Sequence, residues 1–491
     1  MGARKEKNLG SVQVKASLAY TICSIIQKGL SFLTLPIFTR LLTLEQYGQC
    51  SIYFSWSAII AIITTLNLPY GTFSKAMVKF EDSREQYIST VQMICIVLTL
   101  FLLVLYIPLR EYINRFLELP TFLVLILLAE IIANLAVQCW MGKARFEYRY
   151  KSIIVLTLIT SLLMPAVGLI FVLLFEEKGY ARIIGYALIT ILVGTVFLVR
   201  NFIKGKSFFR KDMWKYAFGM NGVLIVYYLS QVIFNQSDRI MISHMLGMDQ
   251  AALYSVAYNI AIILTFVVDA INNSYVPWLY GKIKEDKQQE NKKISILLSI
   301  LIAFLLLGII ALAPELIYVI AGKEYIEAKW VVAPIAMSLL LVFYSQQFIN
   351  IEFYYEKKYL LVVAAIFAAV LNIGLNFWLI PIYGYVAAGY TTLISYFVFA
   401  VSNYLTVLFM MKKSKIENNI FNIPLMLAVL VVFIAIGFLA MFLYNYSIIR
   451  YVIIGVVLIA ILAGSKWIIK LFKNMFKKQE GQNEVTQTEN K

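Results

Sequence analysis

The chain has 491 residues, of which 61% are hydrophobic and 14% are charged, and its formal net charge is +16. A soluble domain is about half apolar and about a quarter charged, so this composition excludes an ordinary soluble protein and indicates a chain that lies in lipid. The positive charge does not call for a nucleic acid partner, because it lies between apolar runs, where it can contact anionic lipid head groups.

Apolar runs of membrane-spanning length follow one another along the chain. A helix of about 20 residues crosses a hydrocarbon core of about 30 Å. Fourteen such runs predict fourteen transmembrane helices. They cover residues 17–39, 47–67, 88–109, 119–142, 153–175, 180–199, 216–243, 252–276, 294–313, 330–351, 359–380, 385–411, 420–443 and 448–469.

The basic residues predict the orientation of these spans. Most of the 43 Lys and Arg residues lie in alternate connections, beginning with the N-terminal segment and ending with the tail. Short connections rich in Lys and Arg mark the cytoplasmic side, so we expect an even number of spans with both termini cytoplasmic. The opposite, outer connections are expected to hold Arg40, Arg110, Arg115, Lys178, Arg182, Lys323, Lys329 and Arg450.

A weak internal repeat predicts the overall architecture. "TRLLTLEQ" (39–46) falls on "SHMLGMDQ" (243–250) when the chain is shifted by 204 residues. This offset covers six spans, so the two halves would share one orientation. We expect an all-α polytopic membrane protein with two six-helix bundles, related by a pseudo-two-fold axis along the membrane normal. Its expected parts are 1–209 (first lobe), 210–412 (second lobe), 413–472 (two additional helices) and 473–491 (a disordered cytoplasmic tail).

Charged and polar side chains inside the spans mark candidate sites. A charge at the bilayer centre costs about 2.5–3.5 kcal/mol on insertion scales and tends to face a bundle interior or a water-filled cavity. Lys28 lies near the middle of the first span and shares a helix face with hydroxyl residues that include Ser24. In the seventh span Asn235 and Arg239 belong to a second polar stripe, with Asp238 beside them. These two polar stripes predict that the first and seventh spans line a cavity.

Two further carboxylates lie inside spans, and the sequence leaves several pairings open. Glu130 lies in the fourth span and Asp269 in the eighth. Lys28 either binds substrate or pairs with Glu130 or Asp269. Arg239 either faces substrate or forms a local ion pair with Asp238. Asp269 is either a structural carboxylate or a carrier of protons or sodium.

Neither a metal site nor a catalytic set is expected. Cys23, Cys50, Cys95 and Cys139 are widely spaced within spans, which fits neither a disulfide framework nor a zinc site. His244, the single histidine, is expected to be a solvated group at a helix end. The longest outer connection, residues 314–329, carries no acid–base constellation, and no GxxxxGK[ST] loop is present. We therefore expect no enzyme.

Two segments resemble a known family. "LPIFTRLLTLEQYG" (35–48) and "SDRIMISHMLGMDQAALYSVAYN" (237–259) resemble the Wzx polysaccharide-export flippases. Their superfamily includes the multidrug and toxic compound extrusion exporters and the lipid II flippase. The resemblance covers essentially the whole chain. It departs from the usual pattern at "NLPYG", where Asn67 replaces an acidic residue, so a carboxylate role there is in doubt.

The resemblance implies a flippase in a bacterial cytoplasmic membrane. It would move undecaprenyl-pyrophosphate-linked oligosaccharide repeat units from the inner to the outer leaflet by alternating access, with membrane lipid and a glycan polymerase machinery as further partners. The alternative is a cation-coupled multidrug exporter of the same fold. No cofactor is expected beyond a coupling proton or sodium ion.

The candidate residues divide by chemistry. A pyrophosphate needs cations that form charge-assisted hydrogen bonds, and hydroxyl and amide groups suit a sugar. Substrate binding is therefore assigned to Lys28, Arg239, Ser24 and Asn235, and ion coupling or structural charge to Asp269, Asp238 and Glu130.

Overall fold

The structure is a computed structural model, which describes residues 32–70, 73–355, 358–413 and 420–457, with residues 19, 23, 26–27, 29–30 and 459. The described chain is helical and contains no strand. Its α-helices are α2 (Leu44–Thr65), α3 (Phe73–Lys79), α4 (Arg84–Leu117), α5 (Thr121–Phe146), α6 (Tyr150–Leu174), α7 (Lys178–Gly205), α8 (Lys211–Leu246), α9 (Met248–Ala261), α10 (Thr265–Lys284), α11 (Asn291–Ala311), α12 (Ala313–Ile320), α13 (Lys329–Tyr354), α14 (Lys358–Tyr383), α15 (Val386–Lys413) and α16 (Ile423–Phe442).

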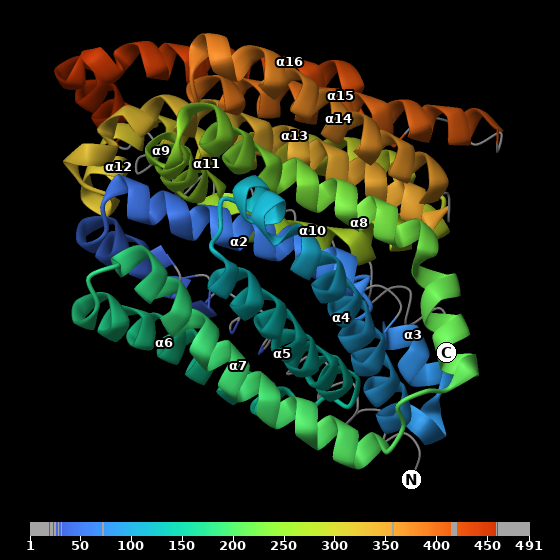
Figure 1. The fold of residues 1–491 in the computed structure, drawn as a ribbon. Helices are drawn as coiled ribbons and strands as arrows, with labels where there is room; N and C mark the ends of the chain where they lie inside the picture. Colours follow the sequence, from blue (N-terminus) through green and yellow to red (C-terminus); the bar gives the residue numbers. More distant parts are fainter. Residues whose placement is uncertain are drawn as a thin grey trace.

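The helices pack as two groups (Figure 1). In the N-terminal group, α2–α7, helix α7 packs against α4, α5 and α6. In the C-terminal group, α8–α16, helix α15 packs against α13 and α14, α14 against α8, and α11 against α16. Helix α2 also contacts α8 and α9, so these three helices form the boundary between the groups.

The repeated sequence motif lies where two of these boundary helices begin. Thr43 and Gln46 form a capping box at the start of α2, in which Thr43 Oγ1 accepts from the Gln46 amide and Gln46 Oε1 accepts from the Thr43 amide. Helix α9 begins directly after Gly247, whose φ is +102°. The two helix starts, residues 44 and 248, therefore lie at the offset that the sequence repeat predicts.

Glycines allow two close helix approaches in the N-terminal group. A Cβ at Gly205 of α7 would lie 1.5 Å from Ser89 Oγ of α4, and one at Gly194 would lie 2.4 Å from the Ala133 carbonyl oxygen of α5. Membrane helices pack tightly where small residues let their backbones approach. These two positions hold α7 against α4 and α5.

One predicted span ends at two residues with left-handed backbone, and another is interrupted. Helix α2 ends at Thr65, where Leu66 and Asn67 both have φ of 51°, and the short helix α3 follows. Helices α9 and α10 are separated by a turn of 3-10 helix, Ile262–Leu264. Left-handed φ and short 3-10 segments redirect a helix axis.

The predicted spans overlap helices wherever they are described. Among the described residues, 10 helices are long and apolar enough to cross a membrane, and Phe32–Leu41 and Ser447–Val457 are shorter apolar helices. Helices α2 and α8 also lie on predicted spans. The number of crossings and the two-bundle symmetry stay predictions. The connection 314–329, expected as a loop, instead folds largely into α12 and a 3-10 helix, Lys323–Ala328.

Candidate functional site

The described candidate residues lie on three helices. Asn235, Asp238 and Arg239 lie on α8, Glu130 on α5 and Asp269 on α10. Lys28 and Ser24 lie outside the described residues.

Arg239 is buried at the boundary between the groups, with 8% of its surface exposed. Its Nη1 donates to Gln236 Oε1 (2.9 Å) and to the Asn235 carbonyl oxygen (3.0 Å), and its guanidinium lies 4.4 Å from the Tyr258 ring centroid. Gln236 also accepts from Ser55 of α2 (3.1 Å). Among the described residues no carboxylate lies within ion-pair distance of Arg239, so its charge is met by neutral groups that bridge to the N-terminal group.

Asp238 faces away from Arg239 into the C-terminal group and is 1% exposed. Its carboxylate accepts from Tyr254 of α9 (2.5 Å), Asn376 of α14 (2.6 Å) and Thr392 of α15 (2.8 Å). The structure therefore does not contain the local Asp238–Arg239 ion pair that the sequence left open. Instead, one buried negative charge is held by three neutral donors from three helices.

Asn235 and the tyrosines around it line the same stretch of α8. Asn235 Oδ1 accepts from Tyr396 (3.0 Å) and Tyr258 (3.4 Å), while its amide donates to the Gln231 carbonyl oxygen (2.8 Å). The predicted polar stripe on α8 is thus an interhelical hydrogen-bond network.

The two remaining carboxylates lie in different environments. Glu130 is partly buried inside the N-terminal group and accepts from Tyr53 of α2 (2.9 Å). Asp269 is exposed on α10, and Gln346 of α13 donates to it at 3.5 Å. The described part of the chain does not bring Asp269, Asp238 and Glu130 together.

Two of the basic residues assigned to outer connections have aromatic or acidic partners in other helices. Arg182 belongs to α7, and its guanidinium lies 4.2 Å from the Phe38 ring centroid and 5.2 Å from that of Tyr47. Arg450, in the helix Ser447–Val457, is buried and paired with Glu315. Aromatic and acidic partners make these positions tolerable for a cation, which a count of basic residues does not detect.

At the predicted outer end, each helix group contacts the other through what we call the outer contact set. Thr39 Oγ1 donates to the Ile320 carbonyl oxygen (3.1 Å), and Arg40 Nη2 donates to that of Val319 (2.8 Å), at the end of α12. In the reverse direction, Ser243 Oγ donates to Glu118 Oε2, and His244 Nδ1 lies 3.6 Å from Glu118 Oε1. His244 is exposed, but it takes part in this contact. The set joins the groups at this end. The residues are Thr39, Arg40, Glu118, Ser243, His244, Val319 and Ile320.

The sequence matches the family described as "Polysaccharide biosynthesis protein" over residues 14–281, which is more than half of the chain. The chain belongs to this polysaccharide biosynthesis protein family. The match spans the N-terminal group and continues through α8 and α9, so it includes Asn235, Asp238, Arg239 and both copies of the repeated motif.

A relative and two solved structures are also similar to this chain. The chain is 24% identical to "Lsg locus putative protein 1" of Haemophilus influenzae over 388 residues, covering 73% of this chain and 89% of the relative. Its fold is similar to lipid II flippase MurJ in an inward closed conformation, with a TM-score of 0.60, 14% identity and coverage of 87% and 99% of the two chains. An inward-facing multidrug resistance MATE family transporter of the MOP superfamily gives a TM-score of 0.58, 15% identity and coverage of 82% and 99%.

These comparisons confirm the resemblance to Wzx-type flippases at the level of family and fold. This polysaccharide biosynthesis family member is a multi-pass membrane protein with the fold of membrane transporters. The fold does not distinguish between a lipid-linked and a drug-like substrate, because flippase and multidrug transporter structures match it equally well.

The partners of Asp238 are the residues that sequence reasoning missed. Asn376 lies 138 residues from Asp238 and Thr392 lies 154 residues from it, so no local pattern connects them. The available signal was the spacing of Asn372 and Asn376, four residues apart on an apolar helix, next to a Thr391–Thr392 pair in α15. Polar pairs of this kind also occur as ordinary interhelical contacts.

Proposed function

We propose that this family member flips undecaprenyl-pyrophosphate-linked oligosaccharide repeat units from the inner to the outer leaflet of a bacterial cytoplasmic membrane. In this proposal both termini are cytoplasmic and the lobes 1–209 and 210–412 rock against each other. The proposal extends the family and fold, which are those of membrane transporters, to one substrate class and one direction.

The observation that carries the proposal is the environment of Arg239. A buried guanidinium is costly in a membrane protein, and its usual compensation is a carboxylate. Arg239 has neutral partners instead, and they lie on the boundary that alternating access would open. When the helix groups separate, Arg239 would be exposed with its charge available for a pyrophosphate. Asn235 would then present an amide to a sugar, and we propose Lys28 and Ser24 of the first predicted span as further ligands.

Asp238 is our candidate for coupling transport to a proton or sodium gradient. It is a buried carboxylate within hydrogen-bonding distance of side-chain oxygens from Tyr254 and Thr392. Carboxylate and neutral oxygen groups suit a small hard cation, and protonation would also relieve the buried charge. Asp269 is exposed and Glu130 is bound to Tyr53, so we assign structural charge to Glu130 and leave Asp269 as a second carrier.

The multidrug alternative shares the fold, but the family match favours a glycan substrate. A purified transporter in vesicles separates the two functions. With a fluorescent polyprenyl-pyrophosphate oligosaccharide in the inner leaflet, we expect movement to the outer leaflet, and we expect no uptake of cationic dyes. Dye transport without movement of the lipid would contradict the proposal.

The binding residues are tested in the same assay and by surface glycan export in a flippase-deficient strain. Lys28→Ala and Arg239→Ala should abolish movement of the lipid, while Lys215→Ala, which removes an exposed cation from the same helix as Arg239, should leave it unchanged. All three variants must reach the membrane in equal amounts. Normal export by both Lys28→Ala and Arg239→Ala would refute the site assignment.

A further inference from the structure

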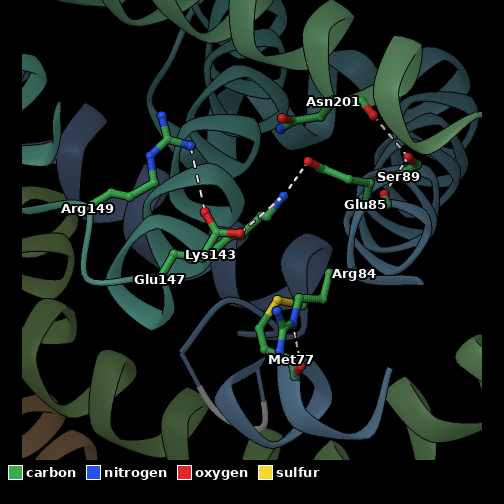
Figure 2. A network of polar contacts seen from close by, with 8 residues as sticks. All are labelled: Met77, Arg84, Glu85, Ser89, Lys143, Glu147, Arg149 and Asn201. Carbon is green, nitrogen blue, oxygen red and sulfur yellow. Dashed lines mark hydrogen bonds and ion pairs between the residues drawn. The ribbon is translucent and has the colours of Figure 1, made fainter. Parts of the chain in front are cut away.

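A charged pocket lies at the predicted inner ends of α4, α5 and α7, and α8, which carries Arg239, does not line it. It is a small hollow that opens to solvent. Four basic side chains line it, together with two acidic ones: Lys143, Arg149, Arg200 and Lys204, with Glu85 and Glu147. Figure 2 shows Lys143 between the carboxylates of Glu85 and Glu147, with Arg149 beside Glu147.

The two acids are occupied by two of the bases. Lys143 pairs with Glu85 and, at 3.5 Å, with Glu147, while Arg149 lies 3.7 Å from Glu147. Arg200 and Lys204 have no carboxylate within ion-pair distance in the described part of the chain. The pocket therefore carries two positive charges that no described carboxylate neutralises.

Hydrogen bonds between neutral groups fix the ends of α4, α5 and α7 around these charges. Ser89 Oγ of α4 donates to the Asn201 carbonyl oxygen of α7 (3.1 Å), and Asn201 Nδ2 donates to the Ala136 carbonyl oxygen of α5 (3.2 Å). Gly205 brings α7 to within contact of Ser89. These buried contacts fix the three helix ends without help from Arg200 or Lys204.

Charge is also not needed to join helix ends in this protein. At the predicted inner end of the C-terminal group, α11 and α13 are joined by Ser295, which donates to Gln347 (2.6 Å). Tyr275 donates to Asn291 at the start of α11 (2.8 Å). All of these groups are neutral and buried. The need to join helix ends therefore does not explain why Arg200 and Lys204 are charged.

The surface next to the pocket is suited to an acyl chain. Leu192, Val196, Val199 and Ile203 are each more than half exposed, and their spacing places them on one face of α7. Arg200 follows Val196 by one helical turn and lies over the Trp140 and Phe197 rings, at 5.8 and 5.9 Å from their centroids. An apolar stripe that ends in cations and a Trp ring is what the hydrocarbon and head-group levels of a bilayer favour.

We propose that this pocket binds the phosphate of an anionic phospholipid, with Arg200 and Lys204 as its ligands and the α7 stripe against an acyl chain. Basic pockets between transmembrane helices are a known form of lipid head-group recognition. The guanidinium fork of Arg200 fits phosphate oxygens. Arg210, which lies further along the chain, is not available, because it donates to both carboxylate oxygens of Asp212 and thereby holds the pKa of that carboxyl below its usual range.

The test measures phospholipid retained by the purified full-length protein, using native mass spectrometry with phosphatidylglycerol and phosphatidylcholine of equal chain length. The protein should retain phosphatidylglycerol selectively. Arg200→Gln with Lys204→Gln should weaken retention about twenty-five-fold, because each basic group near an anionic lipid contributes about a factor of five. The matched control is Arg145→Gln with Lys151→Gln, which removes two exposed cations at the same end but outside the pocket and should retain the lipid.

A third variant should change phosphatidylglycerol retention in the opposite direction. Glu147→Gln releases Lys143 and Arg149 from one carboxylate and should strengthen phosphatidylglycerol retention, a result that damage to the fold cannot produce. Equal retention by the wild type and by Arg200→Gln with Lys204→Gln would overturn the proposal. Displacement of the lipid by millimolar inorganic phosphate or pyrophosphate would also overturn it, because the site would then recognise the free anion.

Discussion

Asp238 and Arg239 are neighbours in sequence, but their side chains serve different parts of the molecule. Asp238 closes a network of α9, α14 and α15 inside the C-terminal group, while Arg239 contacts Gln236 at the boundary with α2. Consecutive residues of a helix point about 100° apart, so one short stretch of α8 supplies both an interior and a boundary group.

Replacing Asp238 with Asn tests its role in coupling. The variant removes the charge but places an amide among three donors, so we expect a loss of about 1–3 kcal/mol in stability, seen as a lower Tm in detergent. We also expect lipid transport in vesicles to lose its dependence on the sodium or proton gradient. Ser230→Ala, on the same helix, serves as the control. Gradient-dependent transport by Asp238→Asn would show that Asp238 is a structural carboxylate.

At the scale of single residues, the sequence predicted which charged side chains lie within spans but not what they contact. The cost of a charge in lipid singles out Asp238, Arg239 and Glu130, because they lie inside predicted spans. Whether a charge meets a partner depends on helices far away in the chain, as Tyr53 does for Glu130 across 77 residues. The aromatic partners of Arg182 and the acidic partner of Arg450 likewise come from other helices, so no local pattern reveals them.

Among the elements, α7 depends most on close backbone contact. Gly205→Ala would place a methyl group 1.5 Å from Ser89 Oγ and 2.4 Å from the Glu85 carbonyl oxygen, so α7 must move away from α4. Such overpacking costs about 1–3 kcal/mol, and we expect a lower Tm. Gly219→Ala on α8 has open space around its Cβ and should match or exceed the wild type. An unchanged Tm for Gly205→Ala would contradict the packing described here.

The outer contact set is the second feature at this scale. Glu118→Ala removes the acceptor for Ser243 and the partner of His244, so the predicted outer end should open more often. The readout is labelling of a cysteine at buried Ser55 by an impermeant maleimide, in a background without the four native cysteines. We expect the rate to rise roughly tenfold, because a hydrogen bond to a charged group contributes about 1.5–3 kcal/mol.

The control for this experiment lies on the same helix. Glu111→Ala removes an exposed carboxylate from α4 and should not change labelling at residue 55. If Glu118→Ala labels as slowly as the wild type, Glu118 does not hold the helix groups together.

Long apolar elements could be predicted from the sequence, whereas short ones could not. Runs such as 88–109 and 294–313 coincide with α4 and α11, because apolar length decides a membrane helix. Helices α3 and α12 and the turn Ile262–Leu264 have fewer than ten residues each, too short for that signal. They depend on local φ values and on neighbouring helices.

For the whole molecule, the orientation is open to a direct test. Tyr112 is exposed at the predicted outer end and Phe208 at the predicted inner end. In right-side-out vesicles an impermeant maleimide should label Tyr112→Cys at once and Phe208→Cys only after permeabilisation, because Lys and Arg accumulate on the cytoplasmic side. The reverse pattern would invert the proposed direction of transport.

The class of the molecule could be predicted from composition and two short motifs, and the family match confirms it. The arrangement of the helix groups could not be predicted in the same way. It depends on contacts such as Arg40 with Val319, which join residues 279 apart. A single sequence carries no direct record of which conformation a transporter favours.

The turn of 3-10 helix between α9 and α10 has a mechanical consequence. Helix α9, before Ile262, is tied to Asp238 through Tyr254, while helix α10, after Leu264, carries the exposed Asp269. A 3-10 turn between two helices can act as a hinge, so α10 can move while α9 stays fixed. Loading of substrate from one leaflet and its release to the other would then be separate events. A chemical cross-link across α9 would stop release without blocking loading.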